Sequence, residues 1–136
     1  MRVFLDANVL FSAAKSDGAI KELLRLLEQS GHQCCVDTYV VEEARRNLEA
    51  KAPDRVAMLE LLLSRMKTAS AQRVDLALEA SLPLPAKDRP VLAAAIHQNC
   101  EALVTGDRSH FGTLYGRTIH GVTIHSPRSL AEALRL

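Results

Sequence analysis

The sequence predicts an α/β fold with three layers, in which helices cover both faces of a central, mostly parallel β-sheet. Short apolar runs without polar alternation recur along the chain and are typical of strands buried on both faces. Segments with apolar residues at helical spacing separate them. Strands that alternate with helices imply right-handed βαβ crossovers, and therefore parallel strands. The length of 136 residues, 48% of them apolar and 24% charged, fits one globular domain over residues 1–136.

Four apolar runs are predicted to be the strands of this sheet. They are residues 2–6, 33–37, 102–105 and 122–124. The first run ends on Asp6, and the third is followed by Gly106 and Asp107. Two carboxylates therefore lie where predicted strands end.

Amphipathic helices are predicted between these strands. Their apolar stripes lie within residues 20–27, 40–48, 55–66 and 91–96. Pro53 and Pro90 suit the first turns of the third and fourth helices, and Ser126 followed by Pro127 is a good start for a last helix. Residues 67–80 stay open, because Val74, Leu76 and Leu78 alternate like a strand while the alanines around them favour a helix.

Composition excludes several classes of protein. No apolar run approaches the roughly 20 residues of a membrane helix, and no signal peptide is evident, so we expect a cytoplasmic protein. The three cysteines have neither disulfide nor metal-ligand spacing and are interpreted as core residues. The net charge of +1 does not by itself indicate a nucleic-acid-binding protein.

Four acidic residues are predicted to meet at one edge of the sheet. Ligands of a parallel α/β sheet bind at the carboxyl ends of its strands. Asp6 and Asp107 follow strands there, while Glu43 and Asp88 lie in the first turns of helices that begin at the same edge. Convergence of these four side chains would form a site for a cation, because the carboxylates would otherwise repel one another.

Each acid also has a simpler interpretation. Asp88 is in phase with the apolar stripe of its helix and so is aimed inward, but an Asp there can instead cap the helix. Asp6 and Asp107 can bond to the turns that follow them. Glu43 lies at the edge of its stripe whereas Glu42 is nearly opposite to it, so Glu43 is the better ligand candidate.

An all-oxygen ligand set predicts Mg²⁺ or Mn²⁺ and disfavours zinc. Such an ion can activate water for attack on a phosphodiester. Basic side chains near this edge could hold a phosphate backbone, although a solvated helix face explains Arg45 and Arg46 equally well. The candidate substrate-binding residues are Arg45, Arg46, Arg89, Arg108 and His110.

These residues resemble the PIN-domain family over nearly the full length of the chain. The matching runs are residues 3–8, 38–48, 88–95, 103–107 with Phe111 after them, and 122–127. The Thr105-Gly106-Asp107 strand end and the spaced acids are the most specific part of the match. Asp6, Glu43, Asp88 and Asp107 match the family's acidic positions, and Asn8 and Thr105 match polar positions beside them.

The resemblance implies a three-layer α/β/α fold and cleavage of RNA that depends on Mg²⁺ or Mn²⁺. Many small members similar to this chain are VapC-like toxins, held inactive by an antitoxin protein and often dimeric. Two positions depart from a simple match. Glu42 adjoins Glu43, and Ser109 stands where some members carry another acid. We therefore expect three or four protein ligands rather than a full two-metal site.

Two other functions remain open from the sequence. One is a phosphatase that uses Asp6 as a nucleophile, although Asn8 stands where such an enzyme would need a second acid. The other is a non-catalytic module that binds RNA or protein, which would follow if the acids do not converge.

Overall fold

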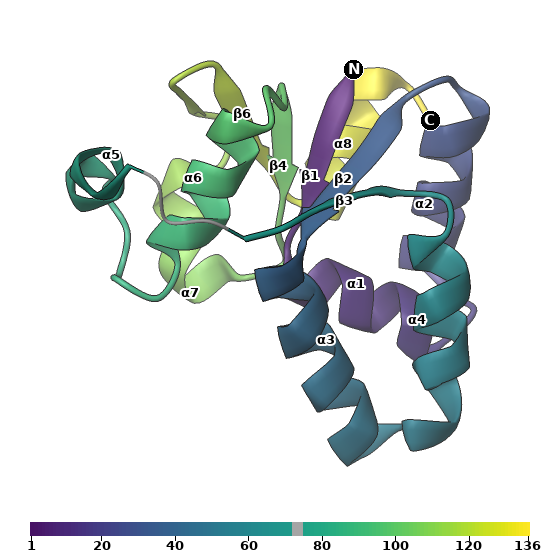
Figure 1. Cartoon of the computed structure of the whole chain (residues 1–136). Coiled ribbons are helices and arrows are strands. Elements are labelled where there is room, and N and C mark those ends of the chain that lie inside the picture. Colours follow the sequence, from purple (N-terminus) through teal and green to yellow (C-terminus); the bar gives the residue numbers. More distant parts are fainter. Residues whose placement is uncertain (72–74) are drawn as a thin grey trace.

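A computed structural model describes residues 1–71 and 75–136 and contains one six-stranded sheet (Figure 1). The strands are β1 (Arg2–Leu5), β2 (Gln33–Asp37), β3 (Lys67–Ala69), β4 (Ala102–Val104), β5 (Thr118–Ile119) and β6 (Val122–His125). Their order is β3-β2-β1-β4-β6-β5. All neighbours pair in parallel except β5 and β6. The mostly parallel sheet predicted from the sequence is confirmed.

Helices cover both faces of this sheet, which confirms the predicted fold class. They are α1 (Ala7–Lys15), α2 (Ala19–Gln29), α3 (Thr38–Lys51), α4 (Val56–Leu63), α5 (Leu76–Ser81), α6 (Arg89–His97), α7 (Arg108–Phe111) and α8 (Pro127–Leu134), with 3₁₀ turns η1 (Pro53–Arg55) and η2 (Gly112–Leu114). On one face, α2 packs against β2 and α8, and α1 packs against α2, α3 and α4. On the other, α6 packs on β4 with α5 beside it (Figure 1). No helix in the described part of the chain is both long and apolar enough to span a membrane.

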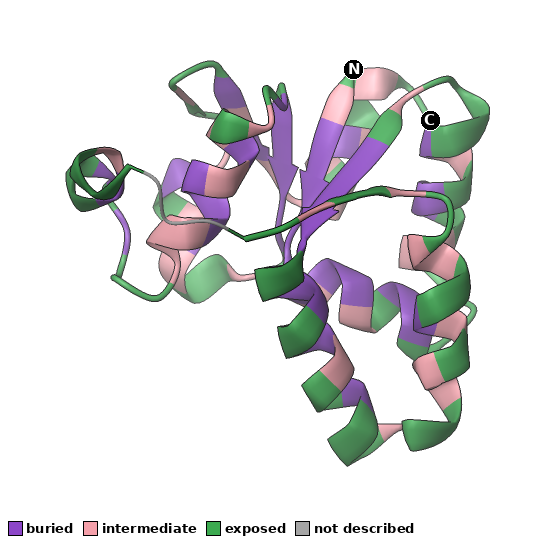
Figure 2. Ribbon diagram, viewed as in Figure 1, coloured by how far each residue is buried: buried purple, intermediate pink, exposed green. Residues whose placement is uncertain are grey.

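The most buried strand lies at the centre of the sheet. Val3, Phe4 and Leu5 of β1 are completely inaccessible to solvent, because β2 and β4 flank the strand and helices cover both its faces. Figure 2 shows β1, β2 and β4 buried almost throughout. Burial on both faces explains why these strands are continuous apolar runs.

The strand order reverses beside β1. The chain proceeds from β1 outward to β2 and β3, and then crosses to β4 on the opposite side of β1. The loops that leave β1 and β4 consequently diverge at their carboxyl ends, which is where ligands bind in open α/β sheets. Asp6 and Thr105 occupy the first positions after these two strands.

Several elements differ from the sequence prediction. Helix α1 and the edge strand β5 were not predicted. Helix α4 is shorter than the predicted 55–66, and Leu59 is its one fully buried residue among the described side chains. The open segment 67–80 divides into β3 and the start of α5, while Val74 lies outside the described residues.

Candidate active site

The ends of β1 and β4 are joined by backbone and side-chain hydrogen bonds. The Asp6 N–H donates to the carbonyl of Val104 at 3.0 Å, and the Gly106 N–H donates to Asn8 Oδ1 at 2.8 Å. A Cβ atom at position 106 would lie 3.4 Å from the same Asn8 oxygen, an ordinary van der Waals contact. Asn8, in the first turn of α1, therefore fixes the loop that carries Asp107.

A buried hydroxyl connects the two strand-end carboxylates. Thr105 is completely buried, and its Oγ1 donates to Asp6 Oδ2 at 2.8 Å. The same oxygen accepts from the Asp107 N–H at 3.1 Å and from Asn8 Nδ2 at 3.3 Å. The Asn8 amide also donates to Asp6 Oδ2 at 3.3 Å. Asp6 and Asp107 are thus held in a fixed relation, and Asn8 and Thr105 are the residues that hold them.

Asp6 is only 6% exposed. The pKa of Asp6 is raised from 3.8 to about 6, mainly by burial and to a smaller extent by the negative charges of Glu43 and Asp88. Hydrogen bonds from Thr105 and the Ala7 N–H oppose this rise. Burial also raises the pKa of the Tyr39 phenol, and Glu43, Asp88 and Asp6 add to that effect. Negative charge therefore concentrates at this edge, and a bound cation would offset it.

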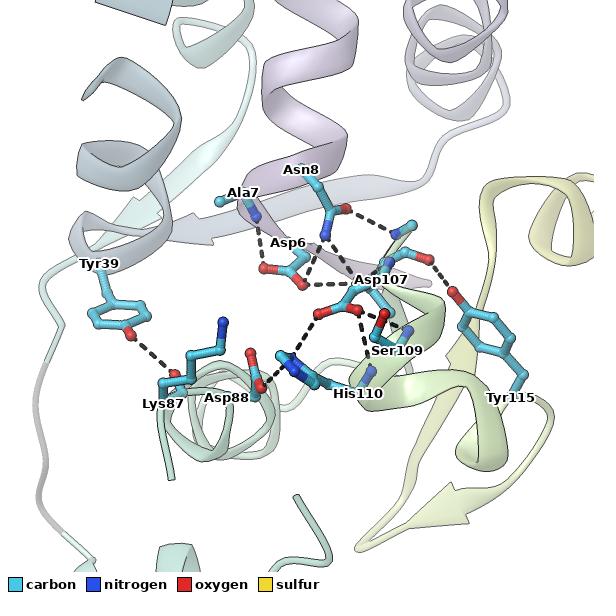
Figure 3. Close-up of polar contacts among 12 residues, drawn as sticks. Asp6, Ala7, Asn8, Tyr39, Lys87, Asp88, Asp107, Ser109, His110 and Tyr115 are labelled. Atoms are coloured by element: carbon cyan, nitrogen blue, oxygen red, sulfur yellow. Dashed lines mark hydrogen bonds and ion pairs between the residues drawn. The ribbon is translucent and has the colours of Figure 1, made fainter. Parts of the chain in front are cut away.

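Asp88 and Asp107 meet around His110 (Figure 3). Nδ1 of His110 lies 2.8 Å from Asp88 Oδ2 and 3.0 Å from Asp107 Oδ2. Asp88 is the N-cap residue of α6, yet its side chain makes no capping hydrogen bond, so the capping alternative for Asp88 is wrong. Helix α6 instead directs this carboxylate toward α7, as the helical phase predicts.

Asp6 and Asp107 use one oxygen each to cap a helix. Asp6 Oδ1 accepts from the Ala7 N–H at 2.7 Å, at the start of α1. Asp107 Oδ1 accepts from the N–H groups of Ser109 and His110 at 3.0 and 3.1 Å, at the start of α7. The second oxygen of Asp107 faces His110. The turn interpretation is therefore confirmed for one oxygen of each residue, while the site interpretation stays a prediction that these hydrogen bonds do not oppose.

The donor atoms near His110 fit a metal ion. Within the described residues, Asp88, Asp107 and His110 offer ligand atoms that all lie within 4.8 Å of one another. Asp88 Oδ2 and His110 Nδ1 are buried, and neither has a hydrogen-bond partner in the described part of the chain. Polar atoms left without a partner in this way are costly unless a ligand or ion satisfies them. Asp6 lies beside this group and is linked to Asp107 through Thr105.

Glu43 stands apart from this group. It is exposed on α3 and is not among the side chains whose ligand atoms lie within 4.8 Å of one another. Its charge nonetheless raises the pKa of Asp6, so it lies near enough to act on the site electrostatically. A role for Glu43 as a ligand stays a prediction.

The predicted basic residues differ in their availability. Arg45 forms an ion pair with Glu60 of α4, and the Nε of Arg89 donates to the carbonyl of Leu84 at 2.8 Å. Arg46 and Arg108 are exposed, and Arg108 begins the helix that carries His110. Of these four, Arg108 is therefore best placed to meet a phosphate at the site.

The sequence did not reveal two contributors to the site, Tyr115 and Tyr39. The Tyr115 hydroxyl donates to the carbonyl of Thr105 at 2.8 Å, and the Tyr39 hydroxyl donates to the carbonyl of Lys87, next to Asp88, at 2.9 Å. His110 was predicted to contact substrate because it follows Asp107 by three residues, a spacing that places both on one face of a helical turn. Its ring lies between two carboxylates, and its role in substrate binding stays a prediction.

Residues 2–109 match the family model described as the PIN domain. The chain belongs to the PIN-domain family. The matched segment includes the four predicted acids and ends one residue before His110. No curated protein sequence is significantly similar to the chain.

Solved structures show that this PIN domain shares its fold with toxin–antitoxin proteins. VapBC2 from Rickettsia felis, bound to a DNA fragment from its promoter, has a TM-score of 0.70 at 17% identity over 93% of this chain and 98% of that one. DNA-bound VapBC from Salmonella typhimurium gives 0.64 at 18% identity, with the same coverage. Mycobacterium tuberculosis VapC20, a toxin that cleaves the sarcin-ricin loop, has a TM-score of 0.56 at 12% identity. That match covers 79% of this chain and 91% of VapC20. At these identities the likeness establishes the fold alone.

Proposed function

We propose that this PIN domain is a metal-dependent endoribonuclease and the toxin of a toxin–antitoxin pair. The observation that carries the proposal is the convergence of Asp6, Asp88 and Asp107 at the carboxyl ends of β1 and β4 (Figure 3). Family membership and the sarcin-ricin-loop cleavage named for VapC20 support RNA as the substrate.

Asp88 and Asp107 are the residues that would hold the ion, with Asp6 beside them and Glu43 within electrostatic reach. The cofactor we propose is Mg²⁺ or Mn²⁺, because carboxylates suit both ions. When bound, such an ion acidifies a water molecule and offsets the negative charge that develops on a phosphodiester.

The protein's own residues hold this arrangement and receive the substrate. The Thr105 hydroxyl and the Asn8 amide fix the carboxylates before RNA binds, so the side chains do not have to reorganise during the reaction. Arg108 is exposed beside the site and can contact a phosphate on either side of the scissile bond. Its contact would position the backbone and carry no sequence preference.

The geometry argues against an aspartyl phosphatase. Asp6 is nearly inaccessible to solvent, and both of its carboxylate oxygens accept hydrogen bonds, from Ala7 on one side and from Thr105 and Asn8 on the other. A nucleophile needs one free oxygen aligned with the phosphorus atom. Three of the four predicted acids, Asp6, Asp88 and Asp107, lie together, which argues against a purely non-catalytic module.

A protein partner and a dimer complete the proposal. The similar structures from Rickettsia felis and Salmonella typhimurium are VapBC assemblies, which supports an antitoxin as a partner for this chain. The chain has a mass of 14.9 kDa, so light scattering on the purified protein would give twice that value for the homodimer and this value for a monomer.

An RNA cleavage assay tests the nuclease. The purified chain should cleave RNA with Mg²⁺ or Mn²⁺ and lose this activity in EDTA. Asp88→Asn and Asp107→Asn should each lower the rate by at least about 100-fold, the loss typical of removing one electrostatic stabiliser of a transition state. Asp54→Asn is the matched control, because Asp54 is exposed in η1 at the other end of α3. Cleavage that survives EDTA would contradict the proposal.

A further inference from the structure

We propose that His110 is itself a metal ligand through Nδ1, together with Asp88 and Asp107, and that this nitrogen makes the site select Mn²⁺ over Mg²⁺. The inference rests on the proposed metal dependence and names the ligand set and the ion. It replaces the role predicted from the sequence, in which His110 contacts substrate and all ligands are oxygens.

The distances match those between ligands of one ion. Nδ1 of His110 lies 2.8 Å from Asp88 Oδ2 and 3.0 Å from Asp107 Oδ2. Two adjacent ligands of an octahedral ion with bonds of about 2.1 Å lie about 3 Å apart. Nδ1 already has this spacing to each carboxylate oxygen, and the three ligand atoms all lie within 4.8 Å of one another, so one ion could contact all three with only small side-chain adjustments.

Hydrogen bonding does not account for the same contacts. Nδ1 of His110 and Oδ2 of Asp88 are both buried, and neither meets the geometry of a hydrogen bond with a described residue; the contact between them is an ion pair only when the ring is protonated. A ring nitrogen presents its single N–H or lone pair along one direction in the ring plane, so it cannot bond two carboxylates equally well. An ion in front of Nδ1 would satisfy the nitrogen and both oxygens together.

Local structure holds the imidazole in place. His110 lies on α7, where its backbone N–H donates to Asp107 Oδ1, so the ligand pair shares one capped helical turn. The next residue, Phe111, is completely buried and anchors this turn in the core. The ring is 30% exposed, which leaves its far side able to reach water. Nδ1 can bind an ion when Nε2 carries the ring proton.

The chemistry of the donors decides between the two ions. Mg²⁺ binds oxygen ligands and gives up its water reluctantly, whereas first-row transition ions accept imidazole readily. Of the two ions proposed above, Mn²⁺ is the transition ion, so it accepts an imidazole beside carboxylates more readily than Mg²⁺ does. A nitrogen in the ligand set also removes the reason for which the sequence disfavoured zinc.

Pulsed electron paramagnetic resonance on the full chain loaded with Mn²⁺ tests the ligand directly. The wild-type protein should show nitrogen modulation from a coordinated imidazole, and histidine labelled with the heavy nitrogen isotope should change that modulation. His110→Asn should abolish it, because the Asn side-chain oxygen can take the place of Nδ1. His120→Asn should retain it, because His120 is exposed in the β5–β6 turn at a positive φ that Asn tolerates. Absence of nitrogen modulation in the wild type, or of Mn²⁺ binding, overturns the proposal.

Titration calorimetry at one fixed pH measures the selectivity. His110→Asn should weaken Mn²⁺ binding by at least about tenfold and Mg²⁺ binding by much less, so the preference for Mn²⁺ falls. An unchanged ratio of the two affinities contradicts the proposal. Nitrogen modulation without any RNA cleavage would instead reject the nuclease and keep the ligand, while metal-dependent cleavage without modulation would reject the ligand and keep the nuclease.

Discussion

Replacing Asp6 by Asn should stabilise the metal-free protein at about pH 8, although the substitution removes a candidate active-site carboxylate. Burial raises the pKa of Asp6 from 3.8 to about 6, so the folded protein holds an ionised carboxylate at this pH against an unfavourable environment. Asn is uncharged and nearly the same size, so it removes this cost. Active-site residues that destabilise the fold are expected where function requires a buried charge.

The size of the effect follows from the pKa. A pKa displaced from 3.8 to about 6 corresponds to about 3 kcal/mol of lost stability when the carboxyl is ionised. Asn can replace only one of the two carboxylate acceptors, and a hydrogen bond from Thr105 or Asn8 is then lost, at about 1 kcal/mol each. We expect a net gain of about 1–2 kcal/mol in the free energy of unfolding.

The gain should depend on pH with a defined sign. Because the folded pKa is raised, the proton bound by folded Asp6 contributes stability that is fully present below 3.8 and is lost as the pH rises through about 6. The advantage of Asp6→Asn should therefore shrink to about zero, or reverse, near about pH 4.5. Urea unfolding in EDTA at both pH values, followed by circular dichroism, measures the difference.

Asp17→Asn is the matched control for this experiment. Hydrogen bonds from Lys21 and Arg55 lower the pKa of the exposed Asp17 to about 2, so its contribution has the opposite sign and is lost only as the pH falls from its unfolded value through about 2. This variant should be slightly less stable than the wild type at both pH values. If Asp6→Asn is less stable than the wild type at about pH 8, or if its effect is the same at both pH values, the ionised Asp6 carboxylate does not destabilise the folded protein.

Two further substitutions test the support of the site and the packing of the fold. Thr105→Val removes the buried hydroxyl that hydrogen-bonds with Asp6, Asn8 and Asp107, and it should lower the free energy of unfolding in urea by about 1–3 kcal/mol. Thr105→Ser keeps a hydroxyl, so its loss of stability should be smaller. Equal losses for the two variants would contradict the role of the hydroxyl. Leu59→Ala should cost about 2–5 kcal/mol because Leu59 is completely buried. Leu61 is 56% exposed on the same helix, so Leu61→Ala should change the free energy of unfolding by no more than about 0.5 kcal/mol. A larger loss for Leu61→Ala than for Leu59→Ala would show that α4 packs through its other face.

The fold class was predictable because its signal is local. Strands β1, β2 and β4 are buried on both faces, so each is a continuous apolar run in the sequence. Helices α2, α3 and α6 carry apolar stripes at helical spacing. Helix α1 was not predicted because three of its five buried residues are alanines, whose small side chains give only a weak apolar stripe in the sequence. Strand β5 has two residues and depends on pairing with β6, so no local pattern marks it.

The candidate site was predictable to a smaller extent. Asp6 and Asp107 follow from strand ends, and the inward direction of Asp88 follows from helical phase. The hydrogen bonds that join Asp6 to Asp107 through Thr105 depend on β1 and β4 being neighbours, although the strands are about a hundred residues apart in the chain. Glu43 has the right position in the sequence, but only the path of α3 leaves it exposed beside the site.

The sequence by itself determined the α/β fold class and the residue types at the edge of the sheet, because burial on two faces and helical phase are properties of neighbouring residues. The tertiary structure alone decided which donors face one another. Asp88 and His110 are brought within 2.8 Å by the packing of α6 beside the loop after β4, a contact between segments with no periodic relation in the chain. A ligand set is a property of positions in space, and the set that we propose for this protein includes a nitrogen that the pattern of acids did not predict.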